Sequence, residues 1–380
     1  MSITPYRNEI ESLFASGYQA ALATTGAGSQ AVQWLLSVGG ASTFVLDACV
    51  PYAMKSLEDY MGFWPLKFVS VSTAQAMAAA AYTRAMAYRP EGAPTLGLGS
   101  TAAIATNYAK KGDHHVALAV HSIEHLHTWQ LKLQKGLRQR QEEELLVSTL
   151  ILSALLEASG LPPLTLPLAE GEFVERQQLP ATQPLDALFA GEVDSVLCYP
   201  PAAYVQQPPF SGAILSGSFN PIHEGHLLLA QTAQRKLGRQ FAFELSLDNV
   251  EKPSLSREAV EERLAQPRLL GQHVLLSRGA PLFRDKAALY PNSVFVVGFD
   301  TARRLIDPRY TAGEAAMLQA FDFIRAQGCS FLVAGRKVDG RYQTLADAAI
   351  PPAIADLFVG LSEDEFRMDL SSTEIRNQRK

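Results

Sequence analysis

The stretch that decides the fold of the C-terminal part of the chain is G-S-F-N-P-I-H-E-G-H, residues 217–226. It follows the apolar run 213–216, which predicts a strand, and precedes 227–237, which predicts a helix. An α/β sheet binds nucleotides at such a place, where a strand ends and the next helix begins. His223 and His226 are three residues apart, so both imidazoles would lie on one face of the first helical turn. There they could donate hydrogen bonds to triphosphate oxygens. The alternative is a Gly/Pro turn followed by two ordinary histidines at a helix start.

Strand and helix patterns alternate on both sides of this stretch. We expect strands at 241–247, 274–277, 293–297 and 331–334 toward the C-terminus. Toward the N-terminus we expect strands at 20–23, 44–50 and 116–120, with helices at 31–36, 73–88 and 139–159. This alternation predicts the α/β class in two domains.

A change of composition separates the two domains. Between residues 161 and 210 prolines stand at 162, 163, 167, 180, 184, 200, 201, 208 and 209. Proline removes backbone donors and disfavours long helices, so this segment predicts a connector with one short strand at 193–198. The expected domains are therefore 1–160 and 211–380, and we expect 211–380 to bind ATP when expressed alone.

The composition excludes several classes of protein. With 380 residues and a net charge of −5, the chain lacks the basic surface of a general nucleic-acid binder. Its three cysteines form no C-x-x-C pair, so no disulfide framework or metal spacing is readable. The apolar run 145–156 is too short to span a bilayer, and the first residues contain no apolar signal core. We expect a cytoplasmic protein that binds neither nucleic acid nor membrane.

Two more segments have residues suited to a nucleotide. D-L-S-S-T-E-I-R, residues 369–376, offers hydroxyl and backbone donors from Ser372 and Thr373, and the planar guanidinium of Arg376. V-V-G-F-D-T-A-R-R-L, residues 296–305, ends an apolar strand where Asp300 could accept hydrogen bonds from ribose and Gly298 could let a base pass. The alternatives are a capped helix start with a surface arginine and a strand that runs into an Asp-capped helix.

These segments together resemble a known family. Residues 217–226 resemble the G-x-F-x-P-x-H-x-G-H signature of the cytidylyltransferase-like nucleotidyltransferases, and 369–376 resembles their I-S-S-T-x-I-R element. With the Gly298–Thr301 segment and Asp307-Pro308-Arg309-Tyr310, residues 211–380 look like a pyridine mononucleotide adenylyltransferase, especially the fungal-type nicotinamide mononucleotide group. The resemblance implies a Rossmann-like parallel-sheet nucleotidyltransferase fold. It also implies transfer of an adenylyl group from ATP, with Mg²⁺, to nicotinamide or nicotinic acid mononucleotide in NAD biosynthesis.

The resemblance also assigns roles to individual residues. The phosphate of the mononucleotide would attack the α-phosphorus of ATP without a protein nucleophile, so positioning and charge stabilisation would drive catalysis. One departure is that Asp248–Pro253 stands where related bacterial enzymes have a Pro-x-x-Lys loop; Lys252 could still reach a phosphate, or be a solvated lysine in a turn. The expected catalytic residues are His223, His226 and Arg376. The expected nucleotide-binding residues are Gly217, Ser218, Phe219, Asn220, Lys252, Gly298, Asp300, Thr301, Ser371, Ser372 and Thr373.

The N-terminal domain resembles, over residues 5–160, the C-terminal domain of the competence-damage-inducible family, which includes nicotinamide-nucleotide amidohydrolases. The A-T-T-G-A-G-S run at 23–29 aligns with that family's A-E-S-C-T-G-G, so Thr25 replaces its active-site serine. Tyr52 matches a family tyrosine, the family lysine falls on Leu57, and the family's G-I-A-G-P loop falls on 100–104. These substitutions favour a structural or dimerising role, and hence an oligomer formed through this domain, over an altered hydrolase at Thr25 and Tyr52.

Five histidines gather at 114, 115, 121, 125 and 127. A metal site is one interpretation, but their spacing matches no metal motif, so we expect strand and turn histidines and no metal site. His114 and His115 would then point to opposite faces of a strand. For the whole chain, two functions other than adenylyl transfer stay open. One is a regulatory protein that binds nucleotides without turnover, and the other is a pyridine-nucleotide hydrolase acting through the N-terminal domain.

Overall fold

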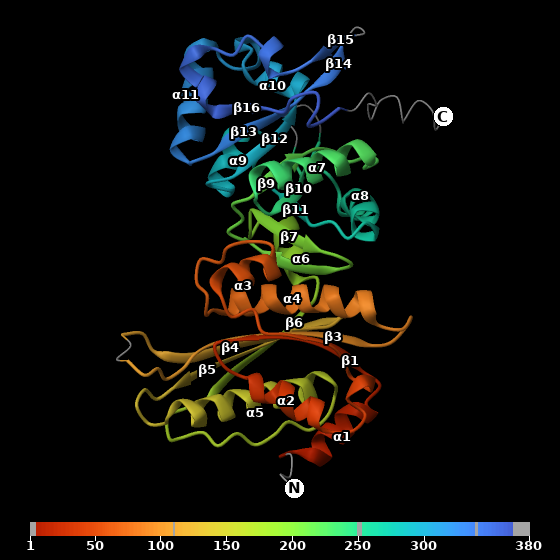
Figure 1. Cartoon of the computed structure of the whole chain (residues 1–380), viewed down its shortest axis with the longest axis vertical. Coiled ribbons are helices and arrows are strands. Elements are labelled where there is room, and N and C mark those ends of the chain that lie inside the picture. Colours follow the sequence, from red (N-terminus) through yellow and green to blue (C-terminus); the bar gives the residue numbers. More distant parts are fainter. Residues whose placement is uncertain (1–4, 109–110, 249–252, 339–340, 368–380) are drawn as a thin grey trace. The chain divides into compact units, whose positions relative to one another are not determined.

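The computed structural model describes residues 5–108, 111–248, 253–338 and 341–367. The chain divides into two units, one formed by residues 1–186 with 201–205 and the other by 187–200 with 206–380. Both units are α/β, as predicted, and each is built on one large sheet (Figure 1). None of the described helices has the length and apolar character needed to cross a membrane.

The N-terminal unit contains a six-stranded mixed sheet in the order β2-β1-β3-β4-β5-β6. β1 pairs in parallel with β2 and β3, and the remaining pairs are antiparallel. The strands are β1 (Gln19–Thr25), β2 (Val45–Cys49), β3 (Thr95–Ala103), β4 (His114–His121), β5 (His125–Leu133) and β6 (Val174–Pro180).

Helices cover both faces of this sheet (Figure 1). On one face lie α1 (Arg7–Ala15), α2 (Ser29–Ser37) and α5 (Arg140–Ala158), which form the larger apolar core with the sheet. On the other face lie α3 (Met54–Met61) and the alanine-rich α4 (Val71–Tyr88). A short 3₁₀ turn, η1 (Ala41–Thr43), precedes β2.

The alanines of α4 let this helix lie directly against the glycines of β3. A Cβ atom added at Gly97 would lie 2.2 Å from the backbone nitrogen of Tyr82, and one added at Gly99 would lie 2.4 Å from the carbonyl oxygen of Ala74. Only glycine fits at these two positions, because the obstructing atoms belong to backbone that cannot move aside.

The segment 161–210 differs from the expected connector, because it contributes strands to both sheets. β6 closes the edge of the first sheet, α6 (Gln183–Ala190) follows, and β7 (Ser195–Tyr199) and β8 (Ala203–Gln206) belong to the second sheet. Two of its prolines mark strand ends, where proline is tolerated in a sheet: Pro180 is the last residue of β6, and Pro200 directly follows β7.

The second sheet has the order β16-β13-β12-β9-β10-β11-β7-β8. Neighbouring strands from β16 to β11 pair in parallel, and β7 lies antiparallel to β11. The parallel strands are β9 (Ala213–Ser216), β10 (Phe241–Ser246), β11 (Val274–Ser277), β12 (Val294–Gly298), β13 (Ser330–Ala334) and β16 (Phe358–Gly360). This mostly parallel sheet agrees with the Rossmann-like nucleotidyltransferase fold expected from the sequence.

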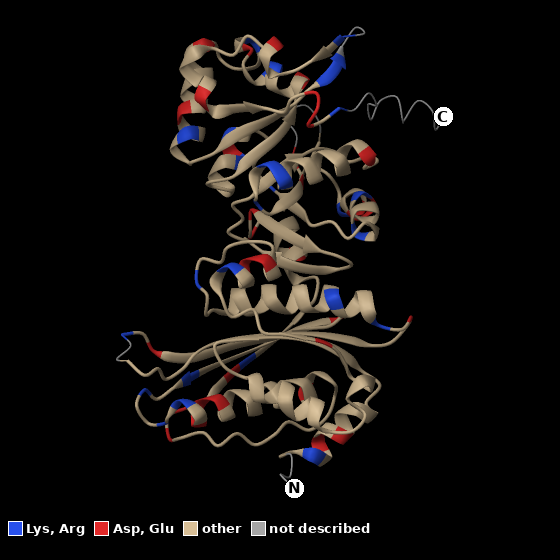
Figure 2. Ribbon diagram, viewed as in Figure 1, with Lys and Arg blue, Asp and Glu red and all other residues tan. Residues whose placement is uncertain are grey.

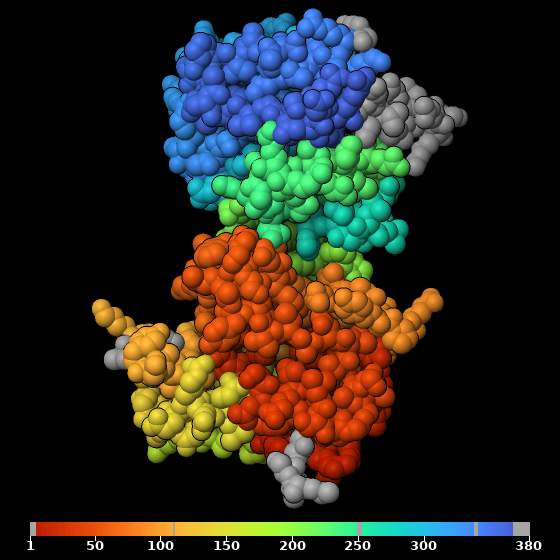
Figure 3. Space-filling model, in the orientation of Figure 1, coloured from red at the N-terminus to blue at the C-terminus, as the bar shows by residue number. Residues whose placement is uncertain are grey.

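Helices also lie on both faces of the second sheet. α7 (Glu224–Leu237) follows the loop whose Phe219 contacts Phe243 on one face, while Phe283 of α9 (Phe283–Leu289) contacts Phe295 and Phe331 on the other. Figure 3 shows α7 and α8 (Arg257–Leu269) at the surface of this unit. The remaining elements are α10 (Phe299–Leu305), α11 (Glu314–Ala326), the hairpin β14 (Arg336–Val338) and β15 (Arg341–Gln343), and the 3₁₀ turns η2 (Pro308–Tyr310), η3 (Leu345–Asp347) and η4 (Pro352–Leu357).

Candidate nucleotide site

The loop 217–223 leaves the sheet at the point where the strand order reverses. From β9 the chain continues to β10 and β11 on one side of β9, and it later returns to β12 and β13 on the other side. Ligands of open α/β sheets bind at such a switch point, beyond the carboxyl ends of the strands. The sequence signal and the topology therefore point to the same edge of the sheet.

Phe219 folds the loop back onto the sheet. Its ring is buried and lies edge-on to Phe243 of β10 and to the His226 ring, with centroids 5.1 and 5.2 Å away. A Cβ atom at Gly217 would lie 2.9 Å from this ring, so packing of Phe219 itself requires glycine at 217. Ser218 and Asn220 are exposed, so both are available to a ligand.

His223 and His226 stack at the start of α7. Their ring centroids are 3.7 Å apart, and His223 is the residue that precedes the first turn. The backbone N–H of His223 donates to Nδ1 of His226 over 3.2 Å. A neutral His226 ring that accepts at Nδ1 must carry its proton on Nε2, so Nε2 is left as a donor.

Burial keeps both imidazoles neutral near pH 7. Burial and then the neighbouring His223 lower the pKa of His226 to about 4. Burial also lowers the pKa of His223. The pair therefore offers neutral hydrogen-bond donors at a helix N-terminus, which is a favourable place for phosphate oxygens.

The end of β12 and the start of α10 supply three more residues of the predicted set, Gly298, Asp300 and Thr301. Among the described residues beyond its chain neighbours, no atom lies within 4 Å of a Cβ atom added at Gly298, and the φ of −77° at this position does not require glycine. Neither packing against the described residues nor backbone geometry therefore explains the glycine at 298, whereas a nucleotide base lying across it would. Asp300 is paired with Arg336 of β14, and Thr301 lies in the wall of a cavity.

A cavity of about 570 Å³ opens at the carboxyl ends of β9, β10 and β11. Ser216, Gly217 and Ser218 form one wall, and Arg263 of α8 lies in another with no hydrogen-bond partner among the described residues. At the rim of the cavity, Asp248 accepts hydrogen bonds from the Ser254 hydroxyl and from the Gly279 N–H. Both hydrogen bonds lower the pKa of the Asp248 carboxyl. The full lining is Ser216, Gly217, Ser218, Glu244, Leu245, Ser246, Leu247, Asp248, Pro253, Leu255, Arg263, Pro281, Phe283, Lys286 and Thr301.

Sequence reasoning missed three charged residues of this cavity: Glu244, Arg263 and Lys286. Glu244 had a readable signal, because it is a carboxylate inside the otherwise apolar strand F-A-F-E-L-S. Lys286 had no such signal, because it lies in α9, 42 residues after the Glu244 that it contacts. Figure 2 shows lysines and arginines interspersed with acidic residues over this unit, so phosphate binding would depend on a few local cations.

Five residues of the predicted set lie outside the described residues. They are Lys252, Ser371, Ser372, Thr373 and Arg376.

The N-terminal site expected from the sequence lies where β1 and β2 end. Thr25 is the last residue of β1, and Tyr52 follows β2 with its side chain exposed. The next amides are occupied by the protein itself, because the Glu144 carboxylate accepts from the N–H groups of Gly28 and Gln30 at 2.8 and 3.2 Å. A side chain thus fills the N-terminus of α2, where an anionic ligand would otherwise bind.

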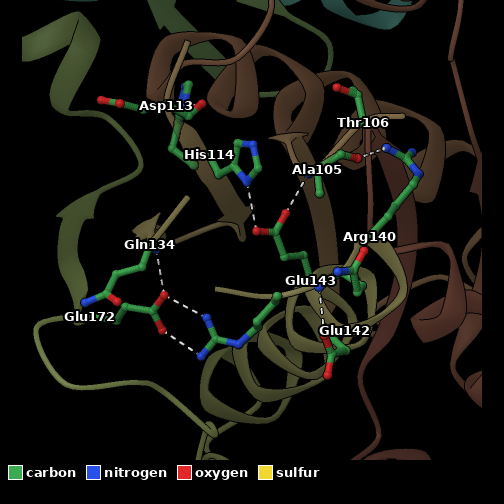
Figure 4. Close-up of polar contacts among 12 residues, drawn as sticks. Ala105, Thr106, Asp113, His114, Gln134, Arg140, Glu142, Glu143 and Glu172 are labelled. Carbon is green, nitrogen blue, oxygen red and sulfur yellow. Dashed lines mark hydrogen bonds and ion pairs between the residues drawn. The ribbon is translucent and has the colours of Figure 1, made fainter. Parts of the chain in front are cut away.

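The neighbouring side chains of α5 fix this end of the sheet (Figure 4). The buried Glu143 accepts from the Ala105 N–H at 2.6 Å and lies 2.8 Å from Nδ1 of His114. Arg140 donates to the carbonyl oxygens of Ala105 and Gly26. Residues 100–103, expected in a loop, belong to β3 instead.

His114 and His115 point to opposite faces of β4, as predicted. His114 meets Glu143 of α5, whereas Nε2 of His115 lies 3.3 Å from the Val69 carbonyl oxygen on the α4 side. Within the described ranges, no group of three or more His, Cys, Asp or Glu side chains could hold a metal ion.

Comparison with known proteins agrees with the geometry of the C-terminal unit. Residues 214–378 match the model of the cytidylyltransferase-like family. This part of the chain is therefore a nucleotidyltransferase domain by class, and more particularly a cytidylyltransferase-like one. No curated protein matches the chain.

Several solved structures are similar to part of the chain. A competence-damaged protein (CinA) superfamily protein from Klebsiella pneumoniae has 12% identity over 41% of this chain and 97% of its own, with a TM-score of 0.31. One from Escherichia coli has 13% identity over 42% and 92%, with a TM-score of 0.31. A competence/damage inducible protein from Agrobacterium tumefaciens has 19% identity over 42% and 99%, with a TM-score of 0.30. Similarity at this level says nothing about activity.

Proposed function

We propose that the C-terminal unit transfers the adenylyl group of ATP to nicotinamide or nicotinic acid mononucleotide and releases pyrophosphate. The observation that carries the proposal is the position of the loop 217–226 between two features. The open space at Gly298 lies on its β12 side, and the 570 Å³ cavity lies on its β10 side. Two nucleotides bound there would meet at the N-terminus of α7.

Each substrate has its own part of the site in this proposal. Adenosine lies across Gly298, with ribose near Asp300 and Thr301, and the triphosphate lies at the N-terminus of α7 beside His223 and His226. The mononucleotide occupies the cavity, where the Arg263 guanidinium is a suitable partner for its phosphate. Lys252 and the segment 371–376, outside the described residues, stay proposed phosphate ligands.

The chemical step needs no protein nucleophile. A phosphate oxygen of the mononucleotide forms a bond to the α-phosphorus of ATP. The bond from that phosphorus to the β-bridging oxygen breaks, and its electron pair leaves with pyrophosphate. Nε2 of His226 donates toward the oxygens that gain charge, because Nδ1 is already an acceptor.

Magnesium fits this site as a partner of the triphosphate. Asp248 is bonded to Ser254 and Gly279, Asp300 is paired with Arg336, and Glu244 is paired with Lys286, so each of these three carboxylates already has a partner. Mg²⁺ would therefore take most of its ligands from phosphate oxygens and water. When bound, it would neutralise part of the triphosphate charge.

For the N-terminal unit we propose a structural rather than a hydrolytic role. The observation behind this is the Glu144 carboxylate, which occupies the backbone donors next to Thr25. An anionic substrate would have to displace it.

The test is incubation of the purified full chain with ATP, Mg²⁺ and each mononucleotide in turn. Chromatography should detect the dinucleotide, and a coupled assay should detect pyrophosphate in equal amount. Folded protein that binds ATP but forms no product with either mononucleotide would instead support the nucleotide-binding regulatory function.

A further inference from the structure

A row of polar side chains lies on one face of three central strands, and three of them, Ser216, Glu244 and Ser246, line the cavity. Glu244 of β10 pairs in register with Ser216 of β9, and Ser246 pairs with Ser277 of β11. Side chains in register on parallel strands share a face, so all four point to the same side of the sheet. The neighbours Phe243 and Leu245 are buried on the opposite face.

Glu244 is fully buried and depends on two partners. Its Oε1 accepts from the Lys286 ammonium at 2.7 Å and from the Ser277 hydroxyl. Lys286 is itself only 3% exposed, so the ion pair is removed from water. A buried carboxylate and a buried ammonium in contact have no net charge, which is the condition under which such groups are tolerated in a core.

The second oxygen of the same carboxylate has no partner. Oε2 of Glu244 is inaccessible to solvent and accepts no hydrogen bond from any described residue. The hydroxyl of Ser216, one strand away, is in the same state. Both residues line the cavity. Because a buried acceptor without a donor destabilises the protein, a ligand that donates a hydrogen bond here would gain affinity by satisfying it.

We propose that Glu244 selects the acceptor by the substituent on its pyridine ring, accepting a hydrogen bond at Oε2 from the carboxamide of nicotinamide mononucleotide. This inference rests on the proposed adenylyl transfer. A carboxamide adds a donor and no charge to the Glu244–Lys286 pair. The carboxylate of nicotinic acid mononucleotide would place two anions beside one cation in a buried site and would leave Oε2 without a donor.

The experiment measures the ratio of kcat/KM for nicotinamide mononucleotide to kcat/KM for nicotinic acid mononucleotide. This ratio does not depend on the fraction of folded enzyme, so a partial loss of stability cannot imitate the effect. A site built to hydrogen-bond a group rejects an analogue that lacks it by large factors, so we expect the wild-type chain to favour nicotinamide by about 100-fold or more.

Glu244→Gln should lower this ratio by about tenfold or more, because its amide can donate to a carboxylate and no longer repels it. Ser277→Ala is the matched control, since it removes a partner of Oε1 and leaves Oε2 unchanged; its ratio should stay within about threefold of wild type. If Glu244→Gln does not accumulate, Glu244→Leu combined with Lys286→Met removes both buried charges and should also abolish the preference.

Two results would overturn the inference while leaving adenylyl transfer intact: a wild-type preference for nicotinic acid mononucleotide, or an unchanged ratio in Glu244→Gln. Absence of product with both acceptors would instead refute the proposed function. Calorimetry with each mononucleotide alone then decides the inference. Selective binding of nicotinamide mononucleotide that is lost in Glu244→Gln supports it, and equal or absent binding of the two refutes it.

Discussion

The imidazoles of His223 and His226 are stacked at the start of α7, with their ring centroids 3.7 Å apart. His223 contributes to the low pKa of about 4 at His226. At neutral pH the two rings therefore act together as uncharged donors. A phosphate bound beside them would place negative charge near both rings and would favour their protonation.

His226→Ala tests this arrangement. The variant loses the Nε2 donor where leaving-group charge develops, and one such donor is worth roughly 10²–10³ in kcat. We expect turnover to fall by about that factor, with only a modest change in ATP affinity and thermal stability. Gln231→Ala, an exposed position on the same helix, is the control. Near-normal turnover in His226→Ala would show that the ring only packs against Phe219.

Gly298→Val tests where adenosine binds. No atom of the described residues beyond the chain neighbours lies within 4 Å of the added Cβ position, and the extended backbone there accepts a β-branched residue, so the fold should be unaffected. We expect ATP affinity to fall at least tenfold, or about 1.4 kcal/mol, with little change in melting temperature. Calorimetric titration with ATP measures this. Unchanged affinity would place the base elsewhere.

The sequence predicted the elements whose pattern is local. The expected strands 213–216 and 274–277 coincide with β9 and β11, and the expected helix 73–88 differs from α4 by two residues at its start. The α/β class is confirmed. β3 was missed because Gly97 and Gly99 weaken any strand pattern. Glycine is needed at both positions because α4 packs directly against β3, and only the tertiary structure shows this contact.

The cavity was less predictable than the loop beside it. Glu244 could be seen as an unusual charge in a strand, but its meaning depends on Lys286 and Ser277, which reach it only after the strands are in register. Likewise, the run 23–29 does not predict that Glu144, more than a hundred residues later, accepts a hydrogen bond from the backbone N–H of Gly28. Such contacts between distant segments have no local signature in one sequence.

Gly99→Ala should destabilise the N-terminal unit. Its methyl group would lie 2.4 Å from backbone atoms of Ala74 and Ala78, so α4 would have to move away from the sheet. Overpacking of this kind costs about 1–3 kcal/mol or more. Thermal or urea unfolding measures the loss. Gly39→Ala is the control, because its Cβ would lie more than 4 Å from every residue that the structure describes other than its chain neighbours, and its effect should stay within about 0.5 kcal/mol. Equal stability of the two variants would contradict the close packing.

His121→Phe should reduce the sensitivity of the N-terminal unit to acid. Burial lowers the pKa of His121 from 6.5 to about 4. Below pH 6.5 the unfolded chain takes up a proton that the folded chain excludes, so stability falls as the pH drops toward 4. Between pH 7.5 and 5 the loss from this one group is about 2 kcal/mol. Phenylalanine keeps the ring contact with Tyr82 and cannot be protonated.

Calorimetric melting of the wild type and of His121→Phe at pH 7.5 and pH 5 measures this effect. The drop in the melting temperature of the N-terminal unit should be smaller in His121→Phe than in the wild type, while His273, whose pKa burial also lowers to about 4, still contributes in the other unit. An identical drop in both proteins would mean that the imidazole is protonated without cost in the folded state.

The boundary of the nucleotidyltransferase unit can be tested with two fragments, because β7 completes its sheet from outside the expected range 211–380. Residues 195–198 pair with the whole of β11, and the Arg278 side chain donates to the Phe189 carbonyl oxygen at 2.6 Å. A fragment starting at 183 keeps these contacts, whereas one starting at 211 exposes β11 as an apolar edge strand.

We expect the fragment 183–380 to bind ATP within about threefold of the full chain, and 211–380 to melt at lower temperature and to aggregate. Thermal melts and ATP titrations of both fragments decide between these outcomes. Equal stability would show that β7 adds nothing to the sheet, and an insoluble 183–380 would show that this unit cannot fold without the N-terminal one.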